Sequence, residues 1–245
     1  MNPLGSDNAY YLDTGWVSSD STIELPNSSS IWIADKNTIG VNEPVKLTWT
    51  SDQNITFEKI ITLDENYLFS VDQRVINNSG LSFDLYPYGL SKRQGIPEMQ
   101  NFFILHEGPL SITDGVLEEY DYDDLKDDKK IKHSSVGGWI GMTDKYWQTA
   151  IIPNQNEPVQ QTYSYSFVDN IDNFQTDIVG ERIAVSNNAS ISHNFKIFAG
   201  PKIVNIIDKY MEEYGFDGFD RSVDFGWFYF LTKPIFNVLE FIYGY

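Results

Sequence analysis

The chain has 245 residues, of which 41% are hydrophobic and 15% aromatic. This length suits one large β domain or two small ones with a sizeable core. The formal net charge is −18, from 17 basic and 35 acidic residues. This balance excludes nucleic-acid binding, which needs clustered Lys and Arg, and it means that any membrane contact must come from a local apolar element. The absence of cysteine excludes disulfides, thiolate nucleophiles and Cys-based zinc sites.

The first residues, "MNPLGSDNAYYLDTGW", have neither a basic nor an apolar region of the kind that makes a signal peptide. Two interpretations stay open at this point. The protein is cytoplasmic, or the chain is the inner part of a longer one.

From about residue 30 to residue 198 the pattern predicts β structure, because apolar and polar residues alternate. A hairpin is predicted from Ile55–Leu63 and Tyr67–Ile76, and Leu81, Phe83 and Leu85 are expected on one face of the next strand. Later strands are predicted at Phe102–His106, Gly138–Met142, Trp147–Ile152, Thr162–Val168, Arg182–Ser186 and Ser190–Phe198. This spacing favours a large β-sandwich over a βαβ fold.

One acidic segment interrupts the strands, with seven acids from Glu118 to Asp128. It has no D-x-[DN]-x-[DN]-G spacing, so a calcium site is disfavoured. We expect a solvated strand edge and loop there.

A helix is predicted at about residues 201–214. Pro201 suits a first helical turn, and Gly215 suits a C-terminal stop. The apolar face that would pack on the sandwich consists of Ile203, Ile206, Ile207, Tyr210, Met211 and Tyr214.

Catalytic motifs are sparse. His106, His133 and His193 lie far apart and show no zinc spacing. One enzymatic hypothesis is an aldose-epimerase-like or carbohydrate-binding sandwich, in which His106–Glu107 or His193 supplies acid–base groups. Another is a binding domain with a ligand cleft between its sheets. No metal or cofactor is expected.

The last twenty residues, "GWFYFLTKPIFNVLEFIYGY", are strongly aromatic. After Pro234 the apolar spacing predicts a helix, with Lys233, Asn237 and Glu240 on one narrow stripe. A bilayer span is disfavoured, because each central charge costs about 2.5–3.5 kcal/mol and each Leu, Ile or Phe returns only about 0.3–0.6 kcal/mol. A helix that lies in the membrane interface is favoured, and a buried core helix is the alternative. The expected interface residues are Trp227, Phe228, Tyr229, Phe230, Ile235, Phe236, Leu239 and Ile242.

Three blocks of the sequence resemble the Oxa/Alb/YidC family of membrane protein insertases. They are "GGWIGMTDKYWQTAIIP", "FAGPKI" and "SVDFGWFYFLTKPIFNVLEFI". The segment from Pro44 to Gly80 is similar to the family's central hairpin region. The similarity covers nearly the whole chain.

The resemblance implies a non-enzymatic large periplasmic domain of a bacterial inner-membrane insertase. The implied fold is mostly β, a galactose-mutarotase-like supersandwich with a packed C-terminal helix over residues 1–221, followed at 222–245 by an amphipathic interface segment. The implied role is a scaffold and docking module. Its implied partners are nascent membrane proteins and the Sec translocon with SecD and SecF.

Two departures from the family pattern are expected. The signal-anchor helix and first strands of the family are absent. The five-helix core is also absent, and its functional arginine matches none of Arg74, Arg93, Arg182 and Arg221.

Overall fold

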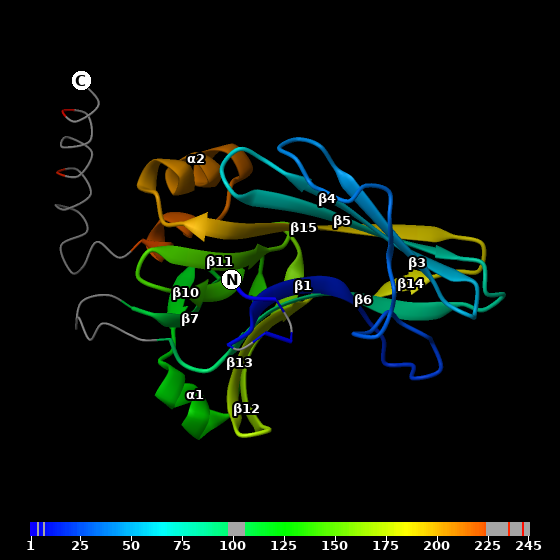
Figure 1. Ribbon diagram of the computed structural model, residues 1–245, viewed down its shortest axis with the longest axis horizontal. Helices are drawn as coiled ribbons and strands as arrows, with labels where there is room; N and C mark the ends of the chain where they lie inside the picture. The colour runs from blue at the N-terminus through cyan, green and yellow to red at the C-terminus, as the bar shows by residue number, and fades with distance from the viewer. Residues whose placement is uncertain (4, 7, 98–105, 224–234, 236–241, 243–245) are drawn as a thin grey trace.

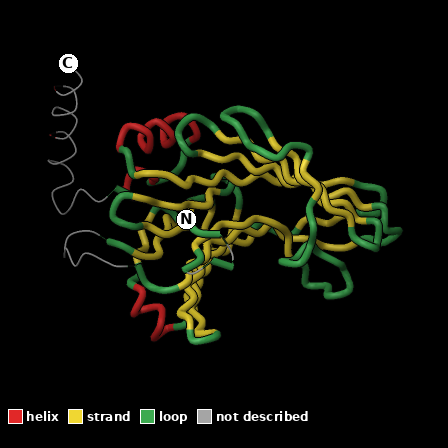
Figure 2. Tube along the Cα trace, viewed as in Figure 1, coloured by secondary structure: helices red, strands yellow, loops and turns green. Residues whose placement is uncertain are grey.

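The structure is a computed structural model that describes the whole chain except residues 4, 7, 98–105, 224–234, 236–241 and 243–245. Two sheets of antiparallel strands form the body of the molecule, and a helix lies along the outside of the larger sheet (Figure 1). Strands dominate the described chain (Figure 2). This mostly β, two-sheet architecture confirms the predicted fold class.

The smaller sheet has six strands in the order β1-β6-β13-β12-β9, with β14 beside β6. Their bounds are β1 (Tyr10–Val17), β6 (Phe83–Gln94), β9 (Lys130–Val136), β12 (Pro158–Val168), β13 (Ile171–Val179) and β14 (Ile183–Val185).

The larger sheet has nine strands in the order β2-β3-β4-β5-β15-β11-β10-β7-β8. Their bounds are β2 (Ile33–Ala34), β3 (Val45–Thr50), β4 (Ile55–Leu63), β5 (Leu68–Asn77), β7 (Gly108–Thr113), β8 (Val116–Glu119), β10 (Trp139–Thr143), β11 (Trp147–Ile152) and β15 (Ser190–Pro201). The helices are α1 (Tyr122–Asp128), α2 (Val204–Tyr214) and the 3-10 turn η1 (Phe219–Ser222).

Apolar side chains fill both the space between the sheets and the space under α2. Between the sheets, Phe174 and Ile178 of the smaller sheet pack with Ile140 and Ile151 of the larger one. Under α2, Trp139 donates its indole N–H to the carbonyl of Asp217 at 3.1 Å. The helix therefore covers the outer face of a sheet whose inner face is also covered, which explains why every residue of β10 and β11 except Trp147 is buried.

The predicted hairpin is confirmed. β4 has the predicted bounds Ile55–Leu63, and β5 begins one residue later than predicted. The Asp64 side chain accepts hydrogen bonds from the backbone N–H groups of Asn66 and Leu68, both at 2.8 Å. This Asx arrangement closes the turn.

The predicted start of the C-terminal helix is wrong. Pro201 is the last residue of β15, opposite Trp147, and α2 begins at Val204. A strand end tolerates proline as well as a first helical turn does, so the residue alone did not decide between them. The stop at Gly215 is confirmed, because this residue is left-handed (φ 67°) and its N–H bonds to the carbonyl of Met211.

The acidic segment is also different from the prediction, which had no helix there. Residues 122–128 form α1. The Asp124 carboxylate accepts a hydrogen bond from the Asp121 N–H at 3.3 Å, and Tyr122 and Leu125 are buried. Two apolar residues three positions apart anchor this short helix on the sandwich, while its acids face water.

Two smaller strand predictions had other outcomes. Phe83 and Leu85 are buried on one face as predicted, but Leu81 is exposed because β6 begins at Phe83. The strand predicted at Phe102–His106 falls on residues outside the described part of the chain, apart from His106, which belongs to no strand.

Candidate functional site

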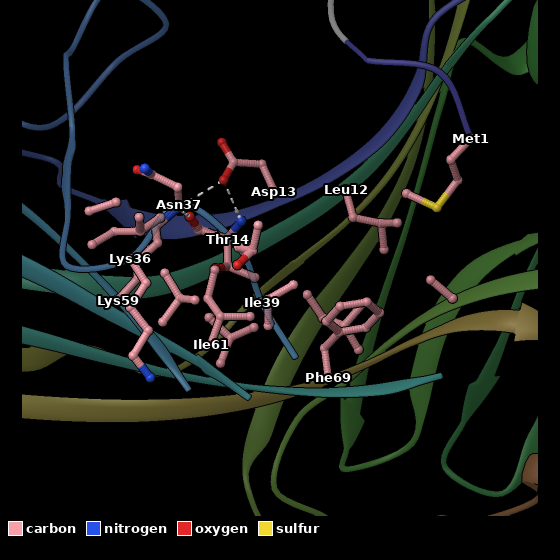
Figure 3. A pocket seen from close by; sticks show the side chains of 17 residues that line it. Met1, Leu12, Asp13, Thr14, Lys36, Asn37, Ile39, Lys59, Ile61 and Phe69 are labelled. Atoms are coloured by element: carbon pink, nitrogen blue, oxygen red, sulfur yellow. Dashed lines mark hydrogen bonds and ion pairs between the residues drawn. The ribbon is translucent and has the colours of Figure 1, made fainter. Parts of the chain in front are cut away.

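A cavity of about 760 Å³ lies between β1 and the inner face of the larger sheet (Figure 3). Its walls are mostly apolar and come from both sheets and from the loop of residues 36–39. The apolar side chains in the walls include Leu12, Ile39, Ile61, Phe69 and Val71. Such a cavity is suited to apolar groups rather than to charged ones.

A polar bridge forms one end of this cavity. The Lys59 ammonium donates to the Asp13 carboxylate at 2.9 Å and also to the carbonyl of Thr14. Asp13 in turn accepts the Thr14 N–H at 2.8 Å, as Figure 3 shows from close by. Lys59 therefore connects the larger sheet to β1, and it satisfies the backbone carbonyl of Thr14.

A second cavity, of about 340 Å³, lies on the other side of the same bridge. Asp13, Thr14 and Lys59 line both cavities, and Trp16, Trp32 and Tyr88 line the second one. Gln73 also lines it, and both polar atoms of this buried amide have no hydrogen-bond partner within the protein. Burial, reinforced by the nearby Asp177 carboxylate, raises the pKa of Tyr88, so this phenol keeps its proton.

Sequence reasoning missed these cleft residues, although a signal for them exists. On β4, Lys59 stands between Phe57 and Ile61 on one face of the strand. On β5, Gln73 stands in the same way between Val71 and Val75. A polar residue in the middle of an apolar face marks a site where something other than core packing is needed.

Each of the three histidines has a different partner. The His106 Nε2 lies 3.1 Å from the carbonyl of Pro109, and the His133 Nε2 lies 2.9 Å from the Tyr120 hydroxyl. His193 is buried against Glu157, with Nε2 2.8 Å from a carboxylate oxygen. Among the described residues no group of three His, Asp or Glu side chains could hold a metal ion.

His193 and Glu157 are a candidate acid–base pair brought together by the fold. They line a cavity of about 510 Å³ together with residues of the β11–β12 loop, Tyr214 and Phe216. The imidazole is enclosed by the rings of Trp16 and Phe195, and its Nδ1 is buried without a partner. This packing leaves the imidazole little room to approach a ligand.

The predicted membrane-interface residues lie almost entirely outside the described part of the chain. These are Trp227, Phe228, Tyr229, Phe230, Phe236 and Leu239. The two that the structure describes, Ile235 and Ile242, are helical and exposed, at 50% and 64% of their surface. None of the helices in the described part of the chain has the length and hydropathy of a membrane span.

The fold and these sites define a class of protein: a two-sheet antiparallel β-sandwich with an outer helix and an apolar cleft. A family model described as the YidC periplasmic domain matches residues 1–238. The chain belongs to this family, which confirms the resemblance and places the chain in the periplasm.

The relatives agree with this assignment. The chain is 40% identical to "Membrane protein insertase YidC" of Rickettsia canadensis (strain McKiel) over 246 aligned residues, and 39% identical to the protein of the same name from Rickettsia rickettsii (strain Sheila Smith). In both cases the alignment covers 100% of this chain and 44% of the relative. The chain therefore spans less than half the length of these relatives.

Solved structures with a similar fold include a galactose mutarotase related enzyme from Lactobacillus acidophilus. It has a TM-score of 0.47 and 10% identity over 69% of this chain and 70% of that chain. A galactose mutarotase-like protein from Lactobacillus casei ATCC 334 also has a TM-score of 0.47, with 11% identity over 69% of this chain and 72% of that chain. Likeness at this level gives no argument about activity.

Proposed function

We propose that this chain is a non-enzymatic scaffold and docking module of a membrane protein insertase at the bacterial inner membrane. The observation that supports the proposal is the family match over residues 1–238. The aromatic segment after residue 226 also supports the proposal, because a contiguous apolar surface that is exposed to water is typical of a membrane or protein contact. The module would help the insertase to insert and fold inner-membrane proteins, alone or with the Sec translocon.

The proposal divides the chain in two. Residues 1–221 form the periplasmic sandwich, and residues 222–245 form an amphipathic segment that lies in the membrane interface and leads to a transmembrane core. Nascent membrane proteins are the proposed substrates, and SecD and SecF are the proposed partners within the Sec translocon. Exposed Ile235 and Ile242 are consistent with an apolar helix face that a bilayer covers.

The membrane part is tested with a peptide of residues 226–245. Its far-ultraviolet circular dichroism is expected to change from disordered in buffer to helical on addition of lipid vesicles, because burial of the apolar face stabilises the helix. A peptide with Ile235→Asn and Ile242→Asn is the matched control and is expected to respond weakly. A wild-type peptide that ignores lipid would overturn the interface assignment.

The docking part is tested in the full-length insertase. Replacing residues 1–221 with an unrelated periplasmic β-sandwich of similar size is expected to reduce co-purification of SecD and SecF, while the membrane level of the insertase is retained. Unchanged co-purification would show that these partners dock on another part of the protein.

The buried His193–Glu157 contact favours a second candidate, the aldose-epimerase-like enzyme. The carboxylate already engages the imidazole Nε2, and the other ring nitrogen is buried, so we assign the pair a structural role. An assay of aldose mutarotation with the wild-type chain and with His193→Ala decides the matter. Activity that disappears on substitution would replace our proposal with the enzymatic one.

A further inference from the structure

A small surface at one end of the larger sheet combines aromatic, aliphatic and basic side chains. It consists of Lys145, Tyr146 and Trp147 from the β10–β11 turn and Lys202 and Ile203 from the β15–α2 connection, and we call it the turn patch. Tyr146 is 65% exposed, Trp147 55% and Ile203 43%. In the described part of the chain, Tyr146 and Trp147 are the only pair of consecutive aromatic residues that are both exposed.

Backbone hydrogen bonds hold the two segments of the turn patch together. The Lys202 N–H donates to the carbonyl of Tyr146 at 2.9 Å, and Trp147 pairs with Pro201 across the sheet. The Asp144 N–H donates to the carbonyl of Trp147 at 2.8 Å. The turn patch is therefore an ordered part of the fold.

An ion pair between Asp144 and Arg93 holds the β10–β11 turn on the smaller sheet. Both carboxylate oxygens of Asp144 accept hydrogen bonds from the Arg93 guanidinium, at 2.6 and 2.9 Å. This leaves the acid engaged with the interior, so that lysines rather than acids accompany the exposed rings. The Lys202 ammonium donates to the Thr143 hydroxyl at 2.9 Å, and the Lys145 ammonium lies 5.1 Å from the centre of the Tyr146 ring.

The turn patch lies toward the same end of the molecule as the last described segment before residue 224 (Figure 1). In Figure 1 the arrow of β15 ends on the left, and the orange-red segment of η1 lies toward the same end of the long axis. This segment is the last one described before exposed Ile235 and Ile242. The periplasmic domain thus presents its exposed aromatic turn toward the end at which η1 lies (Figure 1).

We propose that the turn patch is a second lipid-contacting surface, which rests on the bilayer beside the C-terminal segment. The inference rests on the proposed function, since it needs that segment to bring the domain to the membrane. Trp and Tyr are favoured at the depth of lipid headgroups, where a ring is partly apolar and partly hydrated. Two contacts at one end of the domain would fix its orientation on the membrane.

The chain has no cysteine, so single labels report on single sites. The full chain is labelled with an environment-sensitive fluorophore at Lys145→Cys, which keeps both rings, or at Ile242→Cys. The matched control is Phe167→Cys, in an exposed apolar region at the end of β12. Vesicles of phosphatidylethanolamine and phosphatidylglycerol, with and without nitroxide-labelled lipid, are then added. We expect a blue shift and quenching at positions 145 and 242, and no change at position 167.

A second experiment weakens the contact itself. The double substitution Tyr146→Ser/Trp147→Ser is expected to lower vesicle affinity of the full chain about tenfold, because it removes apolar area that lipid would cover. The double substitution Phe167→Ser/Val168→Ser removes similar exposed area elsewhere and is expected to leave the affinity unchanged. Thermal unfolding of each variant confirms that the domain is folded.

The outcomes separate the two proposals. A response at position 242 without one at 145 would overturn the turn patch as a lipid contact and leave the proposed function intact, with a protein surface as the occupant to seek. No response at either position would overturn both proposals. A response at position 167 equal to that at 145 would show general adsorption and would also overturn the inference.

Discussion

At the scale of single residues, Arg93 connects the smaller sheet with the larger one through an ion pair. It lies at the end of β6, and it reaches Asp144 in the β10–β11 turn and the Tyr122 hydroxyl at the start of α1, the latter at 3.0 Å. Its guanidinium also lies over the ring of Tyr10 at 4.3 Å. Because side chains from three separate segments surround it, its loss leaves Asp144 and Tyr122 without their main partner.

We therefore expect Arg93→Ala to lower the free energy of unfolding by about 3 kcal/mol, the usual cost of removing one partner of a largely buried ion pair. Arg182→Ala is the control. Its ion pair with Asp84 is mostly exposed (63% and 37% of the side chains), so the expected loss is below about 1 kcal/mol. Urea unfolding followed by circular dichroism measures both. Equal losses would contradict the structural role of Arg93.

Asp177 predicts a pH dependence at the same scale. Burial raises the pKa of this carboxyl on β13, against a smaller lowering by its hydrogen bond to Gln175. Its ionised form is therefore disfavoured in the folded state. The neutral carboxyl therefore contributes to the stability of the folded state. This contribution is fully present below pH 3.8, the pKa of the group in the unfolded chain, and it is lost as the pH rises through the folded pKa.

Asp177→Asn should consequently unfold at a higher temperature than wild type at pH 7, and the two curves should converge at a pH below 4. Differential scanning calorimetry across this range measures the difference. Asp20 provides a contrast, since its hydrogen bonds with Thr22 lower its pKa. Asp20→Asn should show the opposite sign, with lower stability at neutral pH that fades as the pH falls.

At the scale of elements, one row of polar residues crosses three neighbouring strands of the larger sheet. Register pairs Lys59 on β4 with Gln73 on β5, and Gln73 with His193 on β15. These three positions face the space between the sheets, where apolar residues otherwise dominate. Sheet pairing therefore assembles this row from residues some of which are more than 100 positions apart in the sequence.

The helix α2 is held on the larger sheet by its apolar face. Ile207 is fully buried among Phe198, Tyr210 and Phe219, whereas Ile203 just before the helix is 43% exposed. Ile207→Ala is expected to cost about 3 kcal/mol through lost burial and a residual cavity, and Ile203→Ala below about 1 kcal/mol. Chemical unfolding compares this matched pair. Similar costs would mean that α2 does not pack as described.

At the scale of the whole molecule, the net charge of −18 is the dominant feature. Few of the acids are paired with bases in the described part of the chain, and the acids of α1 face water together. A compact chain with this charge is destabilised by self-repulsion, which salt screens over about 10 Å at 0.1 M.

The melting temperature at pH 7 should therefore rise by a few degrees when sodium chloride is increased from about 10 to 200 mM. Near pH 4.3, the isoelectric point expected from the sequence, the net charge is close to zero and the rise should disappear. Fluorescence-monitored melting measures both series. A rise of equal size at both pH values would indicate a salt effect unrelated to charge repulsion.

Much of this molecule was predictable because its signals are local. The alternation of residues 55–63 and 147–152 placed β4 and β11 at their observed bounds, and the left-handed stop at Gly215 needs only the absence of a Cβ. The family resemblance could also be recognised from the sequence, because continuous blocks such as residues 137–153 carry it. By contrast, β1, β7, β9 and β13 carry mixed polar and apolar patterns, and the sequence did not single them out.

The sequence by itself determined that this is an acidic, cysteine-free β domain with an outer helix and an apolar ending. It could not show α1, whose two apolar residues become a helix face only when a sheet lies beneath them. Nor could it show the cleft, because Asp13 comes from β1 of the smaller sheet and meets Lys59 and Gln73 of the β4–β5 hairpin only when the two sheets pack together. Tertiary structure also decided that Tyr146 and Trp147 stay exposed while Trp139 is buried, since the same aromatic residue is core or surface according to what packs against it.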